Sequence, residues 1–131
     1  YPEENKGKEA FVRMKKRHRM PGGRDFLMLL RRGKKQESQF FRMIVRRNTI
    51  GYGRLTVVAS RAVARRAVQR NRLRRRVLEW VRTRTDFVRE PYDLLIILKK
   101  EVRAASRRKL YEELSKQWIR TSPLSSHPSR Q

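Results

Sequence analysis

The chain has 131 residues, the length of one domain, and its 36 Lys and Arg outnumber 12 Asp and Glu to give a formal net charge of +24. Like charges in such excess repel one another in a compact fold, so they predict a polyanionic partner, for which nucleic acid is the usual candidate. A membrane surface is the competing polyanion, but no apolar run approaches the roughly 20 residues of a spanning helix.

The chain contains no cysteine, which excludes disulfides and thiolate chemistry. No signal or lipidation pattern is visible, so we expect a cytoplasmic protein that needs no membrane and no protein partner. We interpret residues 1–13 as a flexible N-terminal segment, 14–120 as a single folded domain and 121–131 as a disordered tail.

A basic arm precedes the first predicted helix. It contains Lys15, Lys16, Arg17 and Arg19, and three interpretations stay open for it: nucleic-acid contact, a targeting signal or a solvated tail. Residues 21–23, Pro-Gly-Gly, end the arm. Residues 24–33 then predict a short helix with Gly33 as its C-terminal cap.

Two strands are predicted next. Residues 38–47 alternate in polarity, which places Phe41, Met43 and Val45 on one face. Residues 48–53 have the composition of a turn, so we expect residues 54–59 to pair with the first strand as a hairpin.

The longest predicted helix is rich in arginine and runs from about Arg65 to Arg84. With successive residues about 100° apart, apolar and basic side chains fall on opposite faces. The predicted core face contains Leu73, Val77, Trp80 and Val81, and the predicted outer face contains Asn71, Arg72, Arg75 and Arg82.

Residues 92–98 form a continuous apolar run, which is typical of a strand covered on both faces. A last helix is predicted from the N-cap Ser106, with Tyr111, Leu114 and Trp118 as its buried stripe. The element order α-β-β-α-β-α predicts an α+β fold, a two-layer sandwich with helices over a mostly antiparallel sheet.

The side chains do not predict an active site. His18 and His127 lie in a basic arm and a polar tail, and the acidic residues are dispersed, whereas a two-metal nuclease needs its carboxylates in one place. We therefore predict no catalytic and no metal-binding residue, and interpret the chain as a binding protein.

Residues 67–75, AVQRNRLRR, resemble the motif of the protein subunit of bacterial ribonuclease P. Four further blocks occur in the matching order: KKRHR at 15–19, RDF at 24–26, RLTVVASR at 54–61 and YD at 92–93. The resemblance covers residues 14 to 119. One departure is that Leu30 and Ile44 stand where the family often has aromatic residues.

The resemblance implies a fold like ribosomal protein S5 domain 2, with a left-handed strand-helix-strand crossover that departs from the usual right-handed rule. It implies a protein cofactor that binds a catalytic RNA and the single-stranded 5′ leader of precursor tRNA, with Mg²⁺ held mainly by the RNA. It also implies three groups of binding residues: Arg65, Arg66, Arg70, Asn71, Arg72, Arg74 and Arg75 on the motif helix; Ser60 and Arg61 before it; and Phe26, Leu30, Arg42 and Ile44 in a leader cleft.

Two alternatives remain at this point: a ribosomal or general RNA-binding protein with no processing role, and a nuclease that acts without RNA. If the arginines bind phosphates, Arg70→Ala and Arg72→Ala should weaken RNA affinity and flatten its salt dependence, with the thermal melt nearly unchanged.

Overall fold

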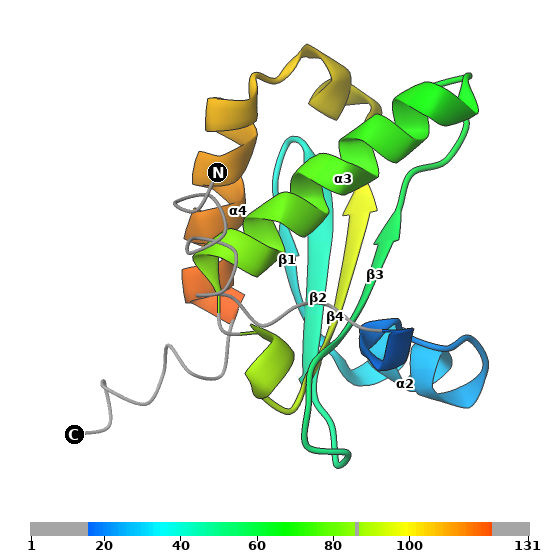
Figure 1. The fold of residues 1–131 in the computed structure, drawn as a ribbon, viewed down its shortest axis with the longest axis vertical. Helices are drawn as coiled ribbons and strands as arrows, with labels where there is room; N and C mark the ends of the chain where they lie inside the picture. The colour runs from blue at the N-terminus through cyan, green and yellow to red at the C-terminus, as the bar shows by residue number, and fades with distance from the viewer. Residues whose placement is uncertain (1–15, 86, 122–131) are drawn as a thin grey trace, which may run out of the picture.

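The computed structural model describes residues 16–85 and 87–121, which fold into one mixed sheet flanked by helices (Figure 1). The predicted flexible segment 1–13, the arm residue Lys15, His127 and most of the predicted tail lie outside the described residues. The α-helices are α2 (Arg24–Arg32), α3 (Ala67–Arg84) and α4 (Arg107–Thr121); the strands are β1 (Lys34–Glu37), β2 (Phe41–Arg47), β3 (Arg54–Val58) and β4 (Tyr92–Leu98); three short 3₁₀ turns are η1 (Lys16–His18), η2 (Phe87–Arg89) and η3 (Lys100–Ala104).

The strand order is β1-β2-β4-β3, so the last strand in sequence lies inside the sheet. β4 pairs antiparallel with β2 and parallel with β3. The predicted hairpin between residues 38–47 and 54–59 is therefore wrong, because the apolar strand β4 occupies the place between them. The prediction for residues 92–98 is confirmed, since all but one of the β4 residues are buried.

The hairpin partner of β2 is instead β1, a strand that the sequence did not predict. Its residues are Lys-Lys-Gln-Glu, and none of its side chains is fully buried. An edge strand needs no apolar face, and charged side chains discourage further pairing at that edge. The element order is therefore the predicted one with β1 inserted after the first helix.

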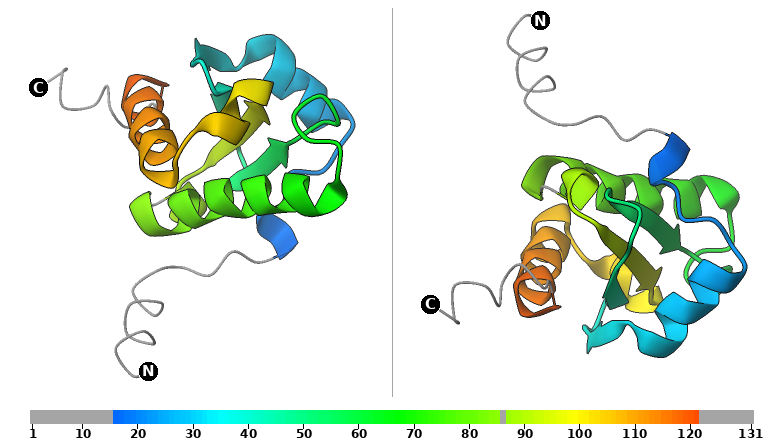
Figure 2. Two further views of the ribbon diagram at one scale, coloured as in Figure 1. Left: turned by 90° about the horizontal axis from the view of Figure 1, so that it is seen from above. Right: turned by 90° about the horizontal axis from the view of Figure 1, so that it is seen from below.

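The connection from β3 through α3 to β4 is left-handed. Both strands run upward in Figure 1, β4 lies to the left of β3, and α3 crosses in front of the sheet. Figure 2, seen from above, places α3 on that same side of the sheet. The implied crossover is thus confirmed as an exception to the right-handed rule.

The sheet buries apolar side chains on both faces. The larger cluster lies under α3 and α4 and contains Phe41, Met43 and Leu94. The smaller cluster, on the opposite face, contains Ile44 and Leu95 beneath α2. Alternation along β2 and β4 explains the division. The two-layer prediction is accordingly modified, because α2 adds a partial third layer.

Gly33 ends α2 as predicted, and its amide donates to the carbonyl of Leu29 at 2.9 Å. Its φ of −68° is not left-handed, so backbone freedom does not explain the glycine. A Cβ at this position would collide with Ile44 Cγ2 and with the carbonyl oxygen of Leu29. Gly33 therefore lets α2 approach β2 closely.

The buried stripe of α3 is the predicted one, whereas that of α4 differs from the prediction. α3 buries Leu73, Val77, Trp80 and Val81, as expected. In α4 the Ser106 hydroxyl accepts the Lys109 amide at 3.0 Å, which confirms the N-cap. The buried stripe of α4 is Leu110, Leu114, Gln117 and Thr121, whereas Tyr111 and Trp118 are only partly buried.

Thr121 is the last residue of α4 and is fully buried, so the predicted tail starts one residue too early. Among the helices of the described ranges, none is long and apolar enough to cross a membrane.

Candidate nucleic-acid interface

The outer face of α3 presents two arginines, Arg72 and Arg75, that have no counter-charge among the described residues, whereas Arg82 on the same face lies 4.0 Å from Glu79. Asn71, Arg72 and Arg75 are exposed, as the helical periodicity predicts. Within residues 16–85 and 87–121, neither Arg72 nor Arg75 forms an ion pair; the pairs there involve other cations. Uncompensated arginines that repel each other along a helix suit an anionic ligand, because guanidinium forks contact phosphate in a bidentate manner.

Two arginines of the same motif face the protein. Nη1 of Arg70 donates to the carbonyls of Ala64 at 3.0 Å and Arg65 at 2.8 Å. Nη2 of Arg74 donates to the carbonyl of Ala59 at 3.4 Å, and its Nη1 donates to the side chain of Asn71. Arg70 and Arg74 therefore hold the loop that precedes α3 against the helix.

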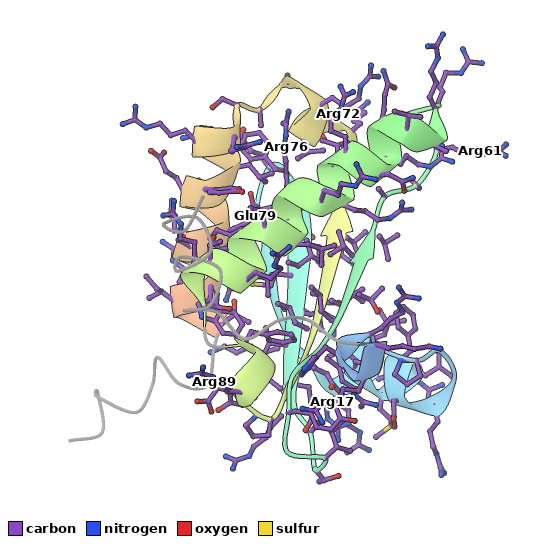
Figure 3. All side chains as sticks on the ribbon, in the orientation of Figure 1. Arg17, Arg61, Arg72, Arg76, Glu79 and Arg89 are labelled. Carbon is purple, nitrogen blue, oxygen red and sulfur yellow. The ribbon has the colours of Figure 1, made fainter. Side chains whose placement is uncertain are left out.

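That loop adds further basic groups at the start of α3. Ser60 accepts the amides of Val63 and Ala64 through its carbonyl, which forms a turn that leaves its side chain and Arg61 exposed. Arg61 extends away from the loop in Figure 3. Arg65 and Arg66 are exposed immediately before the helix, so the predicted residues of loop and helix are contiguous.

The residues predicted to line a cleft lie on the other face of the sheet. Phe26 and Leu30 of α2 are partly buried, and Val58 and Ile97 of the sheet, which the sequence did not single out, lie partly buried around the same cluster. These four side chains form what we call the apolar strip. Ile44 is 0% exposed, so it supports α2 from below and cannot contact a ligand there.

Arg42, the fourth predicted cleft residue, is already paired. Its Nε donates to Glu37 Oε1 at 2.7 Å, and Lys99 Nζ lies 3.0 Å from the other oxygen of Glu37. Hydrogen bonds from Arg42 and then Lys99 lower the pKa of Glu37, because both stabilise its ionised form. Arg42 is exposed, and its pairing with β1 holds it beside the sheet edge.

A buried ion-pair network fixes the position of α2 relative to the sheet. Arg54 donates through Nε and Nη2 to both oxygens of Asp93 at 2.9 Å, and through Nη1 to Asp25 of α2 at 3.1 Å. The hydrogen bonds to Asp93 raise the pKa of Arg54 further, against the opposing effect of its burial. Asn48 also donates to Asp93, at 2.9 Å. The sequence gives no local signal for this network, since its members come from four separate segments.

The basic arm is docked rather than solvated over its described residues. Arg19 forms a parallel bridge with Leu55, and the Met20 amide donates to the Leu55 carbonyl at 3.1 Å. His18 is 1% exposed, with Nδ1 2.8 Å from the Gly53 carbonyl oxygen. The interpretation as a solvated tail is therefore wrong for this part, and Lys16, Arg17 and Arg19 remain exposed beside β3.

Within the described residues, no three side chains of His, Cys, Asp or Glu gather in a way that could hold a metal ion. Asp25 and Asp93, which do lie near each other, are both engaged by Arg54. The donor set of this part of the chain therefore does not fit a resident divalent cation.

A left-handed crossover, an arginine-lined helix on one face of the sheet and an apolar strip on the other define a small, strongly basic α+β protein of the polyanion-binding class. Comparison with known proteins identifies the family. The family model described as Ribonuclease P matches residues 14–122. The chain therefore belongs to the ribonuclease P protein family, and it is a subunit of ribonuclease P.

Relatives and solved structures agree with this assignment. The ribonuclease P protein component of Thermotoga maritima is 32% identical over 94 residues, which cover 72% of this chain and 77% of that protein. The solved structure of the Thermotoga maritima ribonuclease P protein matches with a TM-score of 0.67 and 28% identity, covering 78% of this chain and 96% of that one. A Staphylococcus aureus ribonuclease P protein shares the fold, with a TM-score of 0.66 and 19% identity over 76% of this chain and 90% of that one.

Proposed function

We propose that this protein binds the catalytic RNA of ribonuclease P through α3 and its preceding loop, and the 5′ leader of precursor tRNA on the α2 side of the sheet. The observation that carries this proposal is the exposed position of Arg72 and Arg75 on α3, neither of which has a carboxylate partner in the described part of the chain. The family assignment supplies the identity of the polyanion.

The two surfaces suit different features of RNA. Arg72 and Arg75 offer charge and directed N–H groups, which match phosphate oxygens rather than bases. The apolar strip offers the Phe26 ring among aliphatic side chains, and stacking of a base on such a ring contributes about 1–3 kcal/mol. A single-stranded leader has unstacked bases that can use this surface, whereas a duplex does not.

The protein would then act by positioning rather than by chemistry. Holding the leader beside the catalytic RNA makes the cleavage step effectively intramolecular. The Mg²⁺ ions that assist hydrolysis would be held mainly by the RNA. The place of action would be the cytoplasm, where precursor tRNA is processed.

The test is reconstitution with a bacterial ribonuclease P RNA at low Mg²⁺, with release of the 5′ leader as the measurement. The chain should restore cleavage of precursor tRNA. Arg72→Ala should weaken RNA affinity, and it should reduce the slope of log affinity against log salt concentration by about one. Arg120→Ala, which removes an exposed charge from α4, is the matched control and should change neither.

Other outcomes would favour the alternatives. Equal binding of precursor and mature tRNA, without stimulation of cleavage, would indicate a general RNA-binding protein. Cleavage by the protein after removal of all RNA would indicate a nuclease in its own right. Either result would contradict the proposed function.

A further inference from the structure

A small pocket lies between the first half of α3 and η3, the turn that follows β4. Its volume is about 190 Å³, and it is lined by Ala64, Gln69, Arg72, Leu73, Arg76 and Arg103. Arg72 and Arg76 are one helical turn apart, and Arg103 comes from a different element. Figure 3 shows the labelled Arg72 and Arg76 on the side of α3 that faces the segment after β4.

The three guanidinium groups around this pocket have no partner in the described part of the chain. Within residues 16–85 and 87–121, none of them donates a hydrogen bond to another side chain or carbonyl, and none lies within ion-pair distance of a carboxylate. Arginines at i and i+4 repel each other, and a third one across the pocket adds to the repulsion. An anion between them would remove it.

The remaining walls strengthen the attraction for an anion. Leu73 and Ala64 are buried at 6% and 1% exposure and give the pocket an apolar floor. Charges interact more strongly beside such a low-dielectric wall than in open water. Gln69 contributes an amide that can donate to an oxyanion without adding charge.

The size and lining select the class of ligand. The pocket volume of about 190 Å³ leaves room for a tetrahedral oxyanion with part of its hydration. None of the described residues that line the pocket is aromatic, so they offer no stacking surface for a base. We propose that Arg72, Arg76 and Arg103 together bind one backbone phosphate of the catalytic RNA.

This inference rests on the proposed function for the identity of the RNA, and it adds Arg76 and Arg103 to the contact surface. The pocket lies on the face of the sheet that carries α3, whereas the apolar strip lies beneath α2 on the other face (Figure 2). One RNA segment cannot easily occupy both surfaces, so we assign the pocket to the catalytic RNA and not to the leader.

The first arm of the test uses inorganic phosphate with the full-length protein alone. Thermal melts at constant ionic strength should show that phosphate stabilises the wild type, and that Arg103→Gln weakens phosphate binding on the order of tenfold. Arg120→Gln has the same loss of charge outside the pocket and should behave as the wild type. If the melting temperatures of all three proteins rise equally with phosphate, the proposal that this pocket binds phosphate is wrong.

The second arm measures affinity for a bacterial ribonuclease P RNA against salt concentration. Arg103→Gln should lower affinity on the order of tenfold and reduce the salt slope by about one, while Arg120→Gln leaves both unchanged. If the wild type and Arg103→Gln bind the RNA equally tightly, the proposal that this pocket binds an RNA phosphate is wrong, and the proposed function is unaffected. Failure of the wild type to bind this RNA would contradict the proposed function. The melts in phosphate would then still test whether the pocket binds an anion.

Because the chain contains no cysteine, a third measurement can locate the RNA segment directly. Ala104→Cys places a unique thiol next to Arg103 at an exposed position, where an iron chelate can be attached. Cleavage of the catalytic RNA should be confined to one backbone segment. Cleavage only in the precursor leader would overturn the assignment of the pocket to the catalytic RNA.

Discussion

Arg70 lies in the middle of the arginine motif, but its guanidinium group faces the protein. Its two hydrogen bonds to the carbonyls of Ala64 and Arg65 fix the loop before α3. The sequence alone predicts that Arg70→Ala leaves stability nearly unchanged, and the structure changes this expectation. Arg70→Ala should lower the free energy of unfolding by about 1–2 kcal/mol, because two carbonyls lose a charged donor.

The matched comparison is Arg72→Ala, since Arg72 is exposed and has no intramolecular partner in the described residues. This variant should change the free energy of unfolding by no more than about 0.5 kcal/mol. The free energy of unfolding of both variants is measured by urea denaturation, followed by circular dichroism. Equal stability of the two would mean that the Arg70 contacts do not contribute to folding.

The contact between Arg54 and Asp93 is the most deeply buried ion pair in the described residues, with side chains 9% and 7% exposed. Arg54→Ala would leave the Asp93 carboxylate buried without its main donor, so it should lower the free energy of unfolding by about 3–5 kcal/mol. Asp25→Asn should have an effect below about 1 kcal/mol, because the Asp25 side chain is 54% exposed. A urea midpoint that is lowered equally by both would contradict this ranking.

At the scale of elements, α2 is placed by close packing at its C-terminal end. Gly33→Ala would push α2 away from β2, because the new Cβ meets Ile44 and the carbonyl of Leu29. We expect a loss of about 1–3 kcal/mol in the free energy of unfolding, as for other overpacked sites. Gly22→Ala is the control, since a Cβ there has no heavy atom within 4 Å. Equal stability of both variants would show that α2 tolerates the shift.

Elements with a regular apolar pattern were predictable from the sequence. The stripe of α3, the apolar run of β4 and the Ser106 cap of α4 each depend on local spacing, and the structure confirms them. β1 is not predictable because its four residues are polar and lack the apolar alternation that marks a strand; its pairing with β2 uses the backbone and one exposed ion pair, Arg42 with Glu37. The predicted hairpin between β2 and β3 is wrong because the insertion of β4 between them depends on contacts far apart in the chain.

The same limit applies to the candidate site. Periodicity places Arg72 and Arg75 on the outer face, which the structure confirms as exposed. It cannot show that Arg70 faces a loop, or that Arg103 joins Arg72 and Arg76 around one pocket. These relations arise only when α3, its loop and η3 pack together.

At the scale of the whole molecule, the net charge of +24 should make salt act in opposite directions on folding and on binding. Self-repulsion destabilises the compact protein, and raising the salt from 0.01 to 0.1 M shortens the screening length from about 30 to about 10 Å. The melting temperature of the free protein should therefore rise with sodium chloride. RNA affinity should fall over the same range, because each neutralised phosphate releases a counterion.

Screening and specific anion binding can be separated by comparing sodium chloride with sodium phosphate at equal ionic strength. Screening alone predicts the same melting temperature in both salts, because the Debye length depends on ionic strength and not on the anion. If phosphate occupies the pocket between α3 and η3, the melting temperature should be higher in phosphate, because a ligand that binds only the folded state stabilises it; Arg103→Gln should reduce the difference. A melting temperature that falls as sodium chloride is raised would contradict the premise that charge repulsion limits the stability of the free protein.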